Sequence, residues 1–237
     1  MDCSTYHFLL FTLPHILGCY LFFNGFLPNT HNISSTTNLS QNINSDQKKS
    51  YKKIDKLVFV LIDALRSNFI LNENSHNMPF LQSVIKENRT FSFVSIASSP
   101  TVTMPRIKAI TSGTIPSFFE FFKNSASKEY TQDNFVNQFH NKNISMVFYG
   151  DNTWTKLFPG KFLRSDGTNS FYVNDFYEVD NNVTRHLNSE LASPDWDVMI
   201  LHYLGLDHIG HTHGPFSPLI AKTSRNGFYY SKNLEIN

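Results

Sequence analysis

The feature that most constrains the fold is a pair of apolar runs that each lead to an aspartate. Residues Leu57–Ile62 read Leu-Val-Phe-Val-Leu-Ile and are followed by Asp63, and the run Val198–Leu204 leads to Asp207. Apolar runs of this length without regular polar alternation are typical of strands that are buried on both faces of a parallel sheet. We therefore expect a parallel sheet with helices on each side.

Helical and strand-like patterns alternate along the rest of the chain. Besides the two apolar runs, the sequence predicts helices over 78–87, 105–111, 132–142 and 181–191 and strands over 91–96 and 144–149. Strands that alternate with helices favour a doubly wound α/β fold. In such a fold the ligand site lies beyond the carboxyl ends of the strands, so polar residues that follow strands are the candidate site residues.

The composition narrows the classes of function. The 237 residues carry 20 Lys and Arg against 19 Asp and Glu, so the chain lacks the basic excess with which proteins bind nucleic acids. The two cysteines, Cys3 and Cys19, lie near the amino terminus, which excludes a disulfide framework or a cysteine-based zinc module from the rest of the chain. A bound metal would therefore take His, Asp, Glu or hydroxyl ligands.

Residues 1–28 are predicted to form a membrane anchor. No charged residue lies between Asp2 and Asp46, and the apolar run Phe8–Leu27 has the roughly 20 residues that a helix needs to cross a bilayer. A cleavable signal peptide is the main alternative, although a basic start and a cleavage site are missing, and a buried helical hairpin is another. Residues 29–50 are polar and low in complexity, which is typical of a flexible stalk.

The orientation of this anchor does not follow from charge. The lysines from Lys48 onward lie beyond the range over which positive charges decide topology. Five Asn-x-Ser/Thr sequences would become glycosylated in a lumenal domain, namely those at Asn32, Asn38, Asn88, Asn143 and Asn182. They favour a lumenal domain only mildly, because Asn is abundant in this chain.

The segment 202–215 is rich in histidine. It contains four histidines, and Asp207 and His211 are separated by three residues. Carboxylate oxygen and neutral imidazole are good zinc ligands, and Gly205 and Gly210 would let the backbone bend so that both side chains converge on one ion. The alternative is a Gly-rich loop with surface histidines.

A third element is the hydroxyl-rich turn 98–106, which leads into a predicted helix. The amino end of a helix attracts a phosphoryl group, and a threonine hydroxyl beside a metal ion can attack it. Simple capping of the helix by Thr101 or Thr103 is the alternative. Asp63 taken by itself could equally form a turn or a helix cap.

Together these elements resemble the GPI ethanolamine phosphate transferase family of the alkaline phosphatase superfamily. The resemblance covers motifs at 21–28, 63–66, 78–80, 100–109, 150–154, 179–187 and 202–220. It implies an alkaline-phosphatase-like catalytic domain over 51–220 in the lumen of the endoplasmic reticulum. The implied reaction transfers phosphoethanolamine from phosphatidylethanolamine to a mannose of the GPI precursor. The residues around Thr103 and in 202–211 favour the second mannose. A small membrane-protein partner subunit would fit this setting.

The resemblance also implies roles for individual residues. Asp63 would bind one catalytic zinc ion, Thr103 would be the nucleophile beside it, and Asp207 and His211 would bind a second zinc ion. Thr101 is the fallback nucleophile.

The resemblance also bears on three further residues. Asp151 occupies a family motif and is assigned a substrate-side role. His208 and His213 match no ligand position, and we expect them to support the site or lie on the surface.

The sequence departs from the family pattern in its last part. Family members continue with a downstream Asp-His pair, a further histidine that completes the two zinc sites, and many membrane helices. Residues 221–237 follow a different pattern. We therefore expect an incomplete catalytic domain, with two alternatives to the transferase: a phosphodiesterase or phosphatase that uses water as acceptor, and an inactive fragment.

Overall fold

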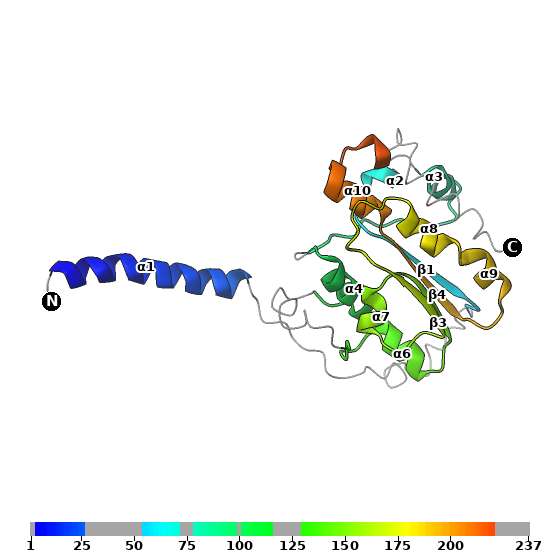
Figure 1. Ribbon diagram of the computed structural model, residues 1–237, viewed down its shortest axis with the longest axis horizontal. Coiled ribbons are helices and arrows are strands. Elements are labelled where there is room, and N and C mark those ends of the chain that lie inside the picture. Colours follow the sequence, from blue (N-terminus) through cyan, green and yellow to red (C-terminus); the bar gives the residue numbers. More distant parts are fainter. Residues whose placement is uncertain (1–2, 27–53, 72–77, 99–100, 116–128, 221–237) are drawn as a thin grey trace, which may run out of the picture. The chain divides into compact units, whose positions relative to one another are not determined.

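The structure is a computed structural model that describes residues 3–26, 54–71, 78–98, 101–115 and 129–220 (Figure 1). It comprises two compact units. The first contains Met1–Thr36 and Ala97–Asp133, and the second contains Thr37–Ile96 and Asn134–Asn237. The predicted stalk and the predicted tail lie outside the described residues, as do Asn32 and Asn38.

Helix α1 of the first unit spans Cys3–Phe26 and runs through Pro14. The side chains of Thr12 and Asn24 donate hydrogen bonds to the carbonyl oxygens of Phe8 and Tyr20, at 2.8 and 2.9 Å. Within the described residues, no helix has both the length and the apolar character that crossing a membrane requires. The predicted anchor does form a helix, but it is not supported as a membrane span.

Helix α4, also in the first unit, spans Thr103–Ser112. The residue before it, Val102, is extended and supplies no capping side chain, and Pro105 lies in the first turn. The helix ends at Gly113, whose φ of 70° is in the left-handed region and whose N–H group bonds to the Ala109 carbonyl. Thr103 is therefore the first helical residue and does not act as the helix cap.

The second unit is built on a four-stranded parallel sheet. Its strands are β1 (Leu57–Ile62), β2 (Met146–Asp151), β3 (Arg164–Thr168) and β4 (Val198–Tyr203), in the order β1-β4-β2-β3. The central strands β4 and β2 are buried along their whole length, whereas the edge strands are partly exposed. This confirms the predicted parallel sheet, but the prediction that the run 57–62 is buried on both faces is wrong, because β1 is an edge strand.

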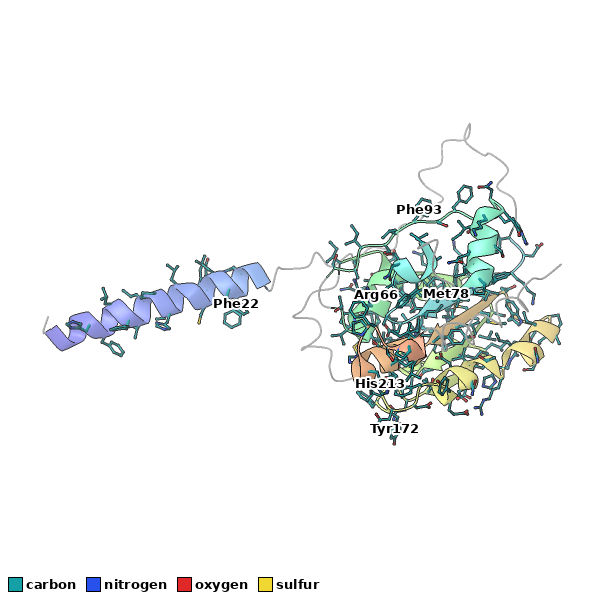
Figure 2. The ribbon with its side chains drawn as sticks, turned by 90° about the horizontal axis from the view of Figure 1, so that it is seen from above. Phe22, Arg66, Met78, Phe93, Tyr172 and His213 are labelled. Carbon is teal, nitrogen blue, oxygen red and sulfur yellow. The ribbon has the colours of Figure 1, made fainter. Side chains whose placement is uncertain are left out.

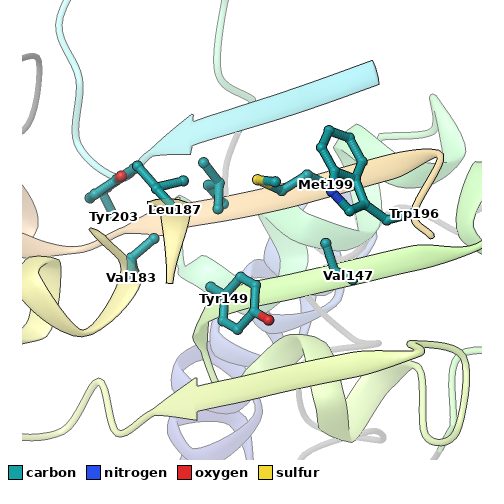
Figure 3. Close-up of a cluster of buried hydrophobic side chains, with 8 residues drawn as sticks. Val147, Tyr149, Val183, Leu187, Trp196, Met199 and Tyr203 are labelled. Atoms are coloured by element: carbon teal, nitrogen blue, oxygen red, sulfur yellow. The ribbon is translucent and has the colours of Figure 1, made fainter. Parts of the chain in front are cut away.

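Helices cover both faces of this sheet. Helices α8 (Glu178–Thr184) and α9 (Leu187–Ala192) lie on one face, where Val183 and Leu187 pack against Val147, Met199 and Leu201 (Figure 3). Helices α6 (Phe135–Asn141) and α7 (Thr153–Leu157) lie on the other face. There the rings of Phe135 and Phe59 are 5.7 Å apart and those of Trp154 and Phe148 are 5.6 Å apart.

Three helices gather near the carboxyl ends of the strands. Helix α10 (Gly205–His213) follows β4 directly, and α2 (Asn68–Leu71) and α3 (Pro79–Lys86) follow β1. They share a small apolar cluster in which Leu206 and Ile209 of α10 meet the fully buried Met78, labelled in Figure 2. This cluster fixes α10 beside the end of β4.

Several predicted elements need correction. The predicted strand 91–96 has no regular structure, and its apolar side chains are exposed, as Figure 2 shows for Phe93. The predicted helix 181–191 is two helices, α8 and α9. Strand β3 was not predicted. It is an edge strand whose residues are exposed at alternate positions, so it needs no apolar run. The predictions for α3, α4, α6 and β2 are confirmed within a few residues.

Candidate functional site

Four polar side chains meet at the carboxyl end of the sheet. Asp63 follows β1, Asp151 ends β2, His202 is the penultimate residue of β4, and Asp207 lies in the first turn of α10. We call these four residues the edge cluster. Their charges act on one another, since Asp63 and Asp151 both influence the pKa values of His202 and Asp207. The structure thus brings together the two predicted carboxylate ligands.

Asp63 is held by a strained turn. Its backbone N–H group bonds to the Tyr203 carbonyl at 2.9 Å, and its Oδ1 accepts from the N–H group of Ala64 at 2.9 Å. Ala64 has a φ of 56°, in the left-handed region that non-glycine residues seldom adopt. Strain of this kind persists where the surrounding structure enforces it, and it often marks functional sites.

His202 is the histidine of the edge cluster, and it is almost completely buried. Its ring is 1% exposed, its Nδ1 accepts a hydrogen bond from the indole N–H group of Trp154 at 3.2 Å, and its Nε2 lies 3.8 Å from Oδ2 of Asp63. Burial lowers the pKa of the imidazole, although the charges of Asp63 and Asp151 oppose that shift. The sequence analysis counted His202 among the histidines but gave it no role.

Asp151 is fully buried beside His202. Its Oδ1 accepts from the N–H group and the hydroxyl of Thr153, both at 2.8 Å, while its Oδ2 has no hydrogen-bond partner among the described residues. A buried carboxylate oxygen without a partner is energetically unfavourable and is typical of residues with a functional role. The substrate-side role predicted for Asp151 stays a prediction.

Asp207 and His211 lie one turn apart on α10. The alternative of a Gly-rich loop is wrong: residues 205–213 are helical, so the spacing of four places both side chains on one helix face. His211 Nε2 is 3.3 Å from Asp207 Oδ2. Burial raises the pKa of Asp207 and the charge of Asp63 raises it further, whereas His211 lowers it.

Helix α10 is positioned by Asp180 of α8, a residue that sequence reasoning quoted in a motif but did not single out. Its Oδ1 accepts from the N–H groups of Leu204 and Gly205, both at 2.9 Å. Gly205 is required here, because a Cβ atom would meet Asp180 Oδ2 at 2.5 Å and the Phe176 carbonyl oxygen at 2.7 Å. Burial raises the pKa of Asp180 to about 6.

His208 and His213, also on α10, are not members of the edge cluster. His208 is buried and its Nδ1 lies 2.7 Å from the Asp175 carbonyl oxygen, whereas His213 is exposed with its ring 5.3 Å from that of Phe176. His213 thus lies on the surface and His208 in the interior, and the non-ligand role expected of both stays a prediction. Thr101 and Thr103 belong to the first unit, so their predicted place beside Asp63 stays a prediction.

The site contains the types of side chain that bind zinc, but the described residues form no complete metal centre. Two atoms bound to one tetrahedral zinc ion stand about 3.3 Å apart, and the Asp207–His211 pair has this separation. Among the residues that the structure describes, no group of three or more His, Cys, Asp or Glu side chains is arranged to hold a metal ion. Zinc binding by Asp63, Thr103, Asp207 and His211 therefore stays a prediction.

Comparison with known proteins identifies the family. The chain is 47% identical over 214 residues to GPI ethanolamine phosphate transferase 2 of Schizosaccharomyces pombe, a match that covers 86% of this chain and 27% of that protein. It is 50% identical over 168 residues to the Homo sapiens catalytic subunit of GPI ethanolamine phosphate transferase 2, covering 70% of this chain and 17% of that protein. The chain therefore belongs with the GPI ethanolamine phosphate transferases.

The matches confirm the resemblance that the motifs indicated. This chain spans about a quarter or less of the length of these relatives. No family model matches the sequence. Among solved structures, murine ectonucleotide pyrophosphatase/phosphodiesterase 5 aligns with a TM-score of 0.45 and 14% identity, over 76% of this chain and 52% of that chain. The family assignment rests on the sequence matches.

Proposed function

We propose that this chain transfers phosphoethanolamine from phosphatidylethanolamine to a mannose of a GPI precursor, the second mannose of the glycan. The observation that carries the proposal is the 47% identity with a GPI ethanolamine phosphate transferase 2 across 86% of this chain. The edge cluster supports it, because three carboxylates and a buried histidine lie at the end of a parallel sheet, where such folds bind ligands.

The proposal assigns a role to each predicted residue. Asp63 and Thr103 hold one zinc ion, and Asp207 with His211 contributes to holding a second. Zinc, when bound, supplies a Lewis acid that stabilises an alkoxide and the charge on a phosphoryl group. Asp151 faces the substrate side of the site. The donor set is oxygen and imidazole nitrogen, which suits zinc.

The reaction proceeds in two balanced steps. The Thr103 oxygen attacks the phosphorus of phosphatidylethanolamine, a new P–O bond forms, and the bond to the diacylglycerol oxygen breaks, so that diacylglycerol leaves with a proton. A mannose hydroxyl then attacks the same phosphorus and forms a new P–O bond, the bond to the Thr103 oxygen breaks, and the mannose proton ends on that oxygen. Splitting the exchange in this way passes one phosphodiester to another acceptor without water. Thr101 is the alternative nucleophile.

The proposed setting follows from the substrates. Both are membrane lipids, which places the enzyme at the endoplasmic reticulum membrane, with the catalytic domain in the lumen and with room for a small membrane-protein partner. Asn88 and Asn143 are exposed in turns with φ values of 54° and 57°, whereas Asn182 lies within α8. We therefore expect glycan at Asn88 and Asn143 before Asn182.

The test is capture of the covalent intermediate. The 237-residue chain is incubated with zinc and phosphatidylethanolamine, and peptide mass spectrometry looks for phosphoethanolamine on Thr103. Thr103→Ala should abolish the adduct, and Thr101→Ala, which removes the neighbouring hydroxyl, should leave it unchanged. An adduct on Thr101 moves the nucleophile by two residues.

A second arm separates transfer from hydrolysis. A mannosylated GPI precursor added to the reaction should receive the phosphoethanolamine. Release of free phosphoethanolamine with the precursor present, or cleavage of a soluble phosphodiester in its place, contradicts the proposal and indicates a hydrolase. Absence of adduct and product with zinc and both lipids present contradicts it as well.

A further inference from the structure

We infer that His202 is a positioning residue whose Nε2–H group holds the carboxylate of Asp63, and that Trp154 fixes the tautomer that makes this possible. The inference rests on the proposed function in one respect, since that function makes Asp63 a zinc ligand. It adds two residues to the site, neither of which the motif analysis assigned a role.

The tautomer follows from the chemistry of the Trp154 contact. An indole nitrogen can only donate a hydrogen bond, so Nδ1 of His202, 3.2 Å away, must accept and must carry no proton. A neutral imidazole then carries its proton on Nε2. This is the nitrogen that lies 3.8 Å from Oδ2 of Asp63. The N–H group of His202 therefore faces a carboxylate oxygen.

The same contact argues against His202 as a zinc ligand. Histidines that bind metal donate from one ring nitrogen to a carbonyl or carboxylate and bind the ion with the other. In His202 the arrangement is reversed, because one nitrogen accepts from Trp154 and the other carries the proton. A protonated Nε2 has no lone pair for a metal ion. His202 thus acts on Asp63 and not on the ion itself.

The surroundings hold the ring in place. His202 and Trp154 are 1% and 0% exposed, and their rings are in edge contact at 6.4 Å. Gly150 of β2 lets the strands approach closely, since a Cβ atom there would meet the His202 carbonyl oxygen at 2.3 Å and its Cβ at 2.8 Å. Nε2 of His202 has no hydrogen-bond partner within 3.5 Å among the described residues. A small rotation of the Asp63 carboxylate would complete the bond.

Nuclear magnetic resonance of the 15N-labelled chain tests the tautomer directly. We expect His202 to show a protonated Nε2 and an unprotonated Nδ1, before and after zinc is added. In Trp154→Phe the donor is lost and the Nδ1–H tautomer should become populated. A proton on Nδ1 in the unaltered chain overturns the inference, and so does a shift of Nε2 to a metal-bound position when zinc is added.

Zinc affinity, measured by competition with a chelator, tests the effect on Asp63. His202→Leu should weaken zinc binding by about 10–100-fold, and His202→Gln, whose amide can donate to Asp63 and accept from Trp154, should restore most of it. Trp154→Phe should weaken it by about 10-fold. Equal zinc affinities in all three variants overturn the inference, and Trp154→Phe keeps the test valid where His202→Leu fails to fold.

Trp196→Phe is the matched control. Trp196 is 1% exposed and its indole donates to the Glu190 carbonyl at 2.6 Å, so the control loses a comparable buried hydrogen bond away from the edge cluster. Its zinc affinity should match that of the unaltered chain. Because the sequence has 2 tryptophans, this variant also leaves Trp154 as the single tryptophan, whose emission can be excited selectively. Its emission should change when zinc binds.

The two proposals fail in distinguishable ways. If the unaltered chain binds no zinc while His202 shows the Nε2–H tautomer, the metal chemistry of the proposed function is wrong and the pairing of His202 with Trp154 stands. If zinc binds and the His202 variants bind it equally well, the proposed function stands and the positioning role is wrong.

Discussion

The second unit contains two clusters of charged side chains that are built in opposite ways. In the first, which we call the Arg164 cluster, the guanidinium at the start of β3 bonds to both oxygens of Glu190 and both oxygens of Asp195, with distances of 2.7–2.9 Å. Tyr149 adds a hydrogen bond to Glu190. In the edge cluster, Asp151 Oδ2 and His202 Nε2 have no hydrogen-bond partner among the described residues.

The pKa values show the same contrast. The hydrogen bonds from Arg164 hold the pKa values of Glu190 and Asp195 below their usual range, because they favour the charged carboxylates. Burial instead raises the pKa of Asp207 in the edge cluster. The Arg164 cluster therefore stabilises the fold, whereas the edge cluster leaves polar atoms available to a ligand. Sites that bind ligands often lower stability in this way.

The largest expected effect is that of Asp207→Asn on the edge cluster. Loss of this carboxylate should weaken zinc binding by about 100-fold. Stability without metal should stay the same or rise, because a buried carboxylate beside Asp63 is replaced by a neutral amide. Chelator competition and thermal unfolding measure the two quantities. A lower melting temperature together with unchanged zinc affinity would show that Asp207 stabilises the fold and does not bind zinc. The edge cluster would then no longer differ from the Arg164 cluster.

The pH dependence of unfolding tests Asp180, which is intermediate between the two clusters. Its carboxylate is buried, but it accepts hydrogen bonds from two backbone N–H groups. Its pKa in the folded protein, about 6, lies above the unfolded value near 3.8, so the folded state binds the proton more tightly. This contribution is fully present below about pH 4 and is lost as the pH rises through 6, which lowers the unfolding free energy by at most about 3 kcal/mol.

In Asp180→Asn this pH dependence should disappear. The amide keeps an acceptor oxygen for the N–H groups of Leu204 and Gly205 and does not titrate. Denaturant unfolding at pH 4, 5, 6 and 7 compares the two proteins, and Asp133→Asn, which removes a half-buried carboxylate of the first unit, is the control. Parallel curves for the native chain and Asp180→Asn would show that Asp180 does not titrate in this range.

Glu190→Gln breaks the Arg164 cluster. Glu190 is 5% exposed, and the substitution removes the charge from its hydrogen bonds with Arg164. Hydrogen bonds to charged groups contribute about 1.5–3 kcal/mol, and the lower end applies because Arg164 is partly exposed. The unfolding free energy should fall accordingly with zinc affinity unchanged. A change in zinc affinity as large as that of Asp207→Asn would show that the two clusters are coupled.

Tyr149→Phe should have the smallest effect. It removes one hydrogen bond to Glu190 and leaves both bonds from Arg164, so a loss of about 1 kcal/mol of unfolding free energy is expected. Burial and Glu190 raise the pKa of the Tyr149 hydroxyl, so this bond persists across the neutral range. Chemical unfolding measures the difference. A loss equal to that of Glu190→Gln would mean that Tyr149, and not Arg164, dominates the cluster.

Apolar patterning predicted two strands that are buried on both faces, which is correct for the central strand β4 and wrong for the edge strand β1, whose residues are partly exposed. The runs at 57–62 and 198–204 became β1 and β4, and strand-helix alternation gave the doubly wound arrangement. The same reasoning failed where burial is partial: the polar edge strand β3 was missed, and the apolar segment 91–96 is exposed without strand structure. The apolar pattern of the sequence shows which residues can be buried. The neighbouring strands decide which of these residues are in fact buried.

The same distinction applies to the candidate site, since some of its features follow from the sequence and others only from the tertiary structure. The sequence by itself determined that Asp63, Asp151 and Asp207 follow or end strands, and its motifs determined the family. Only the tertiary structure decided that α10 is a helix, that Asp180 holds its first turn, and that Trp154 donates to His202 from a different element. A hydrogen bond between residues 48 positions apart depends on strand order and register, which arise from the packing of the whole sheet.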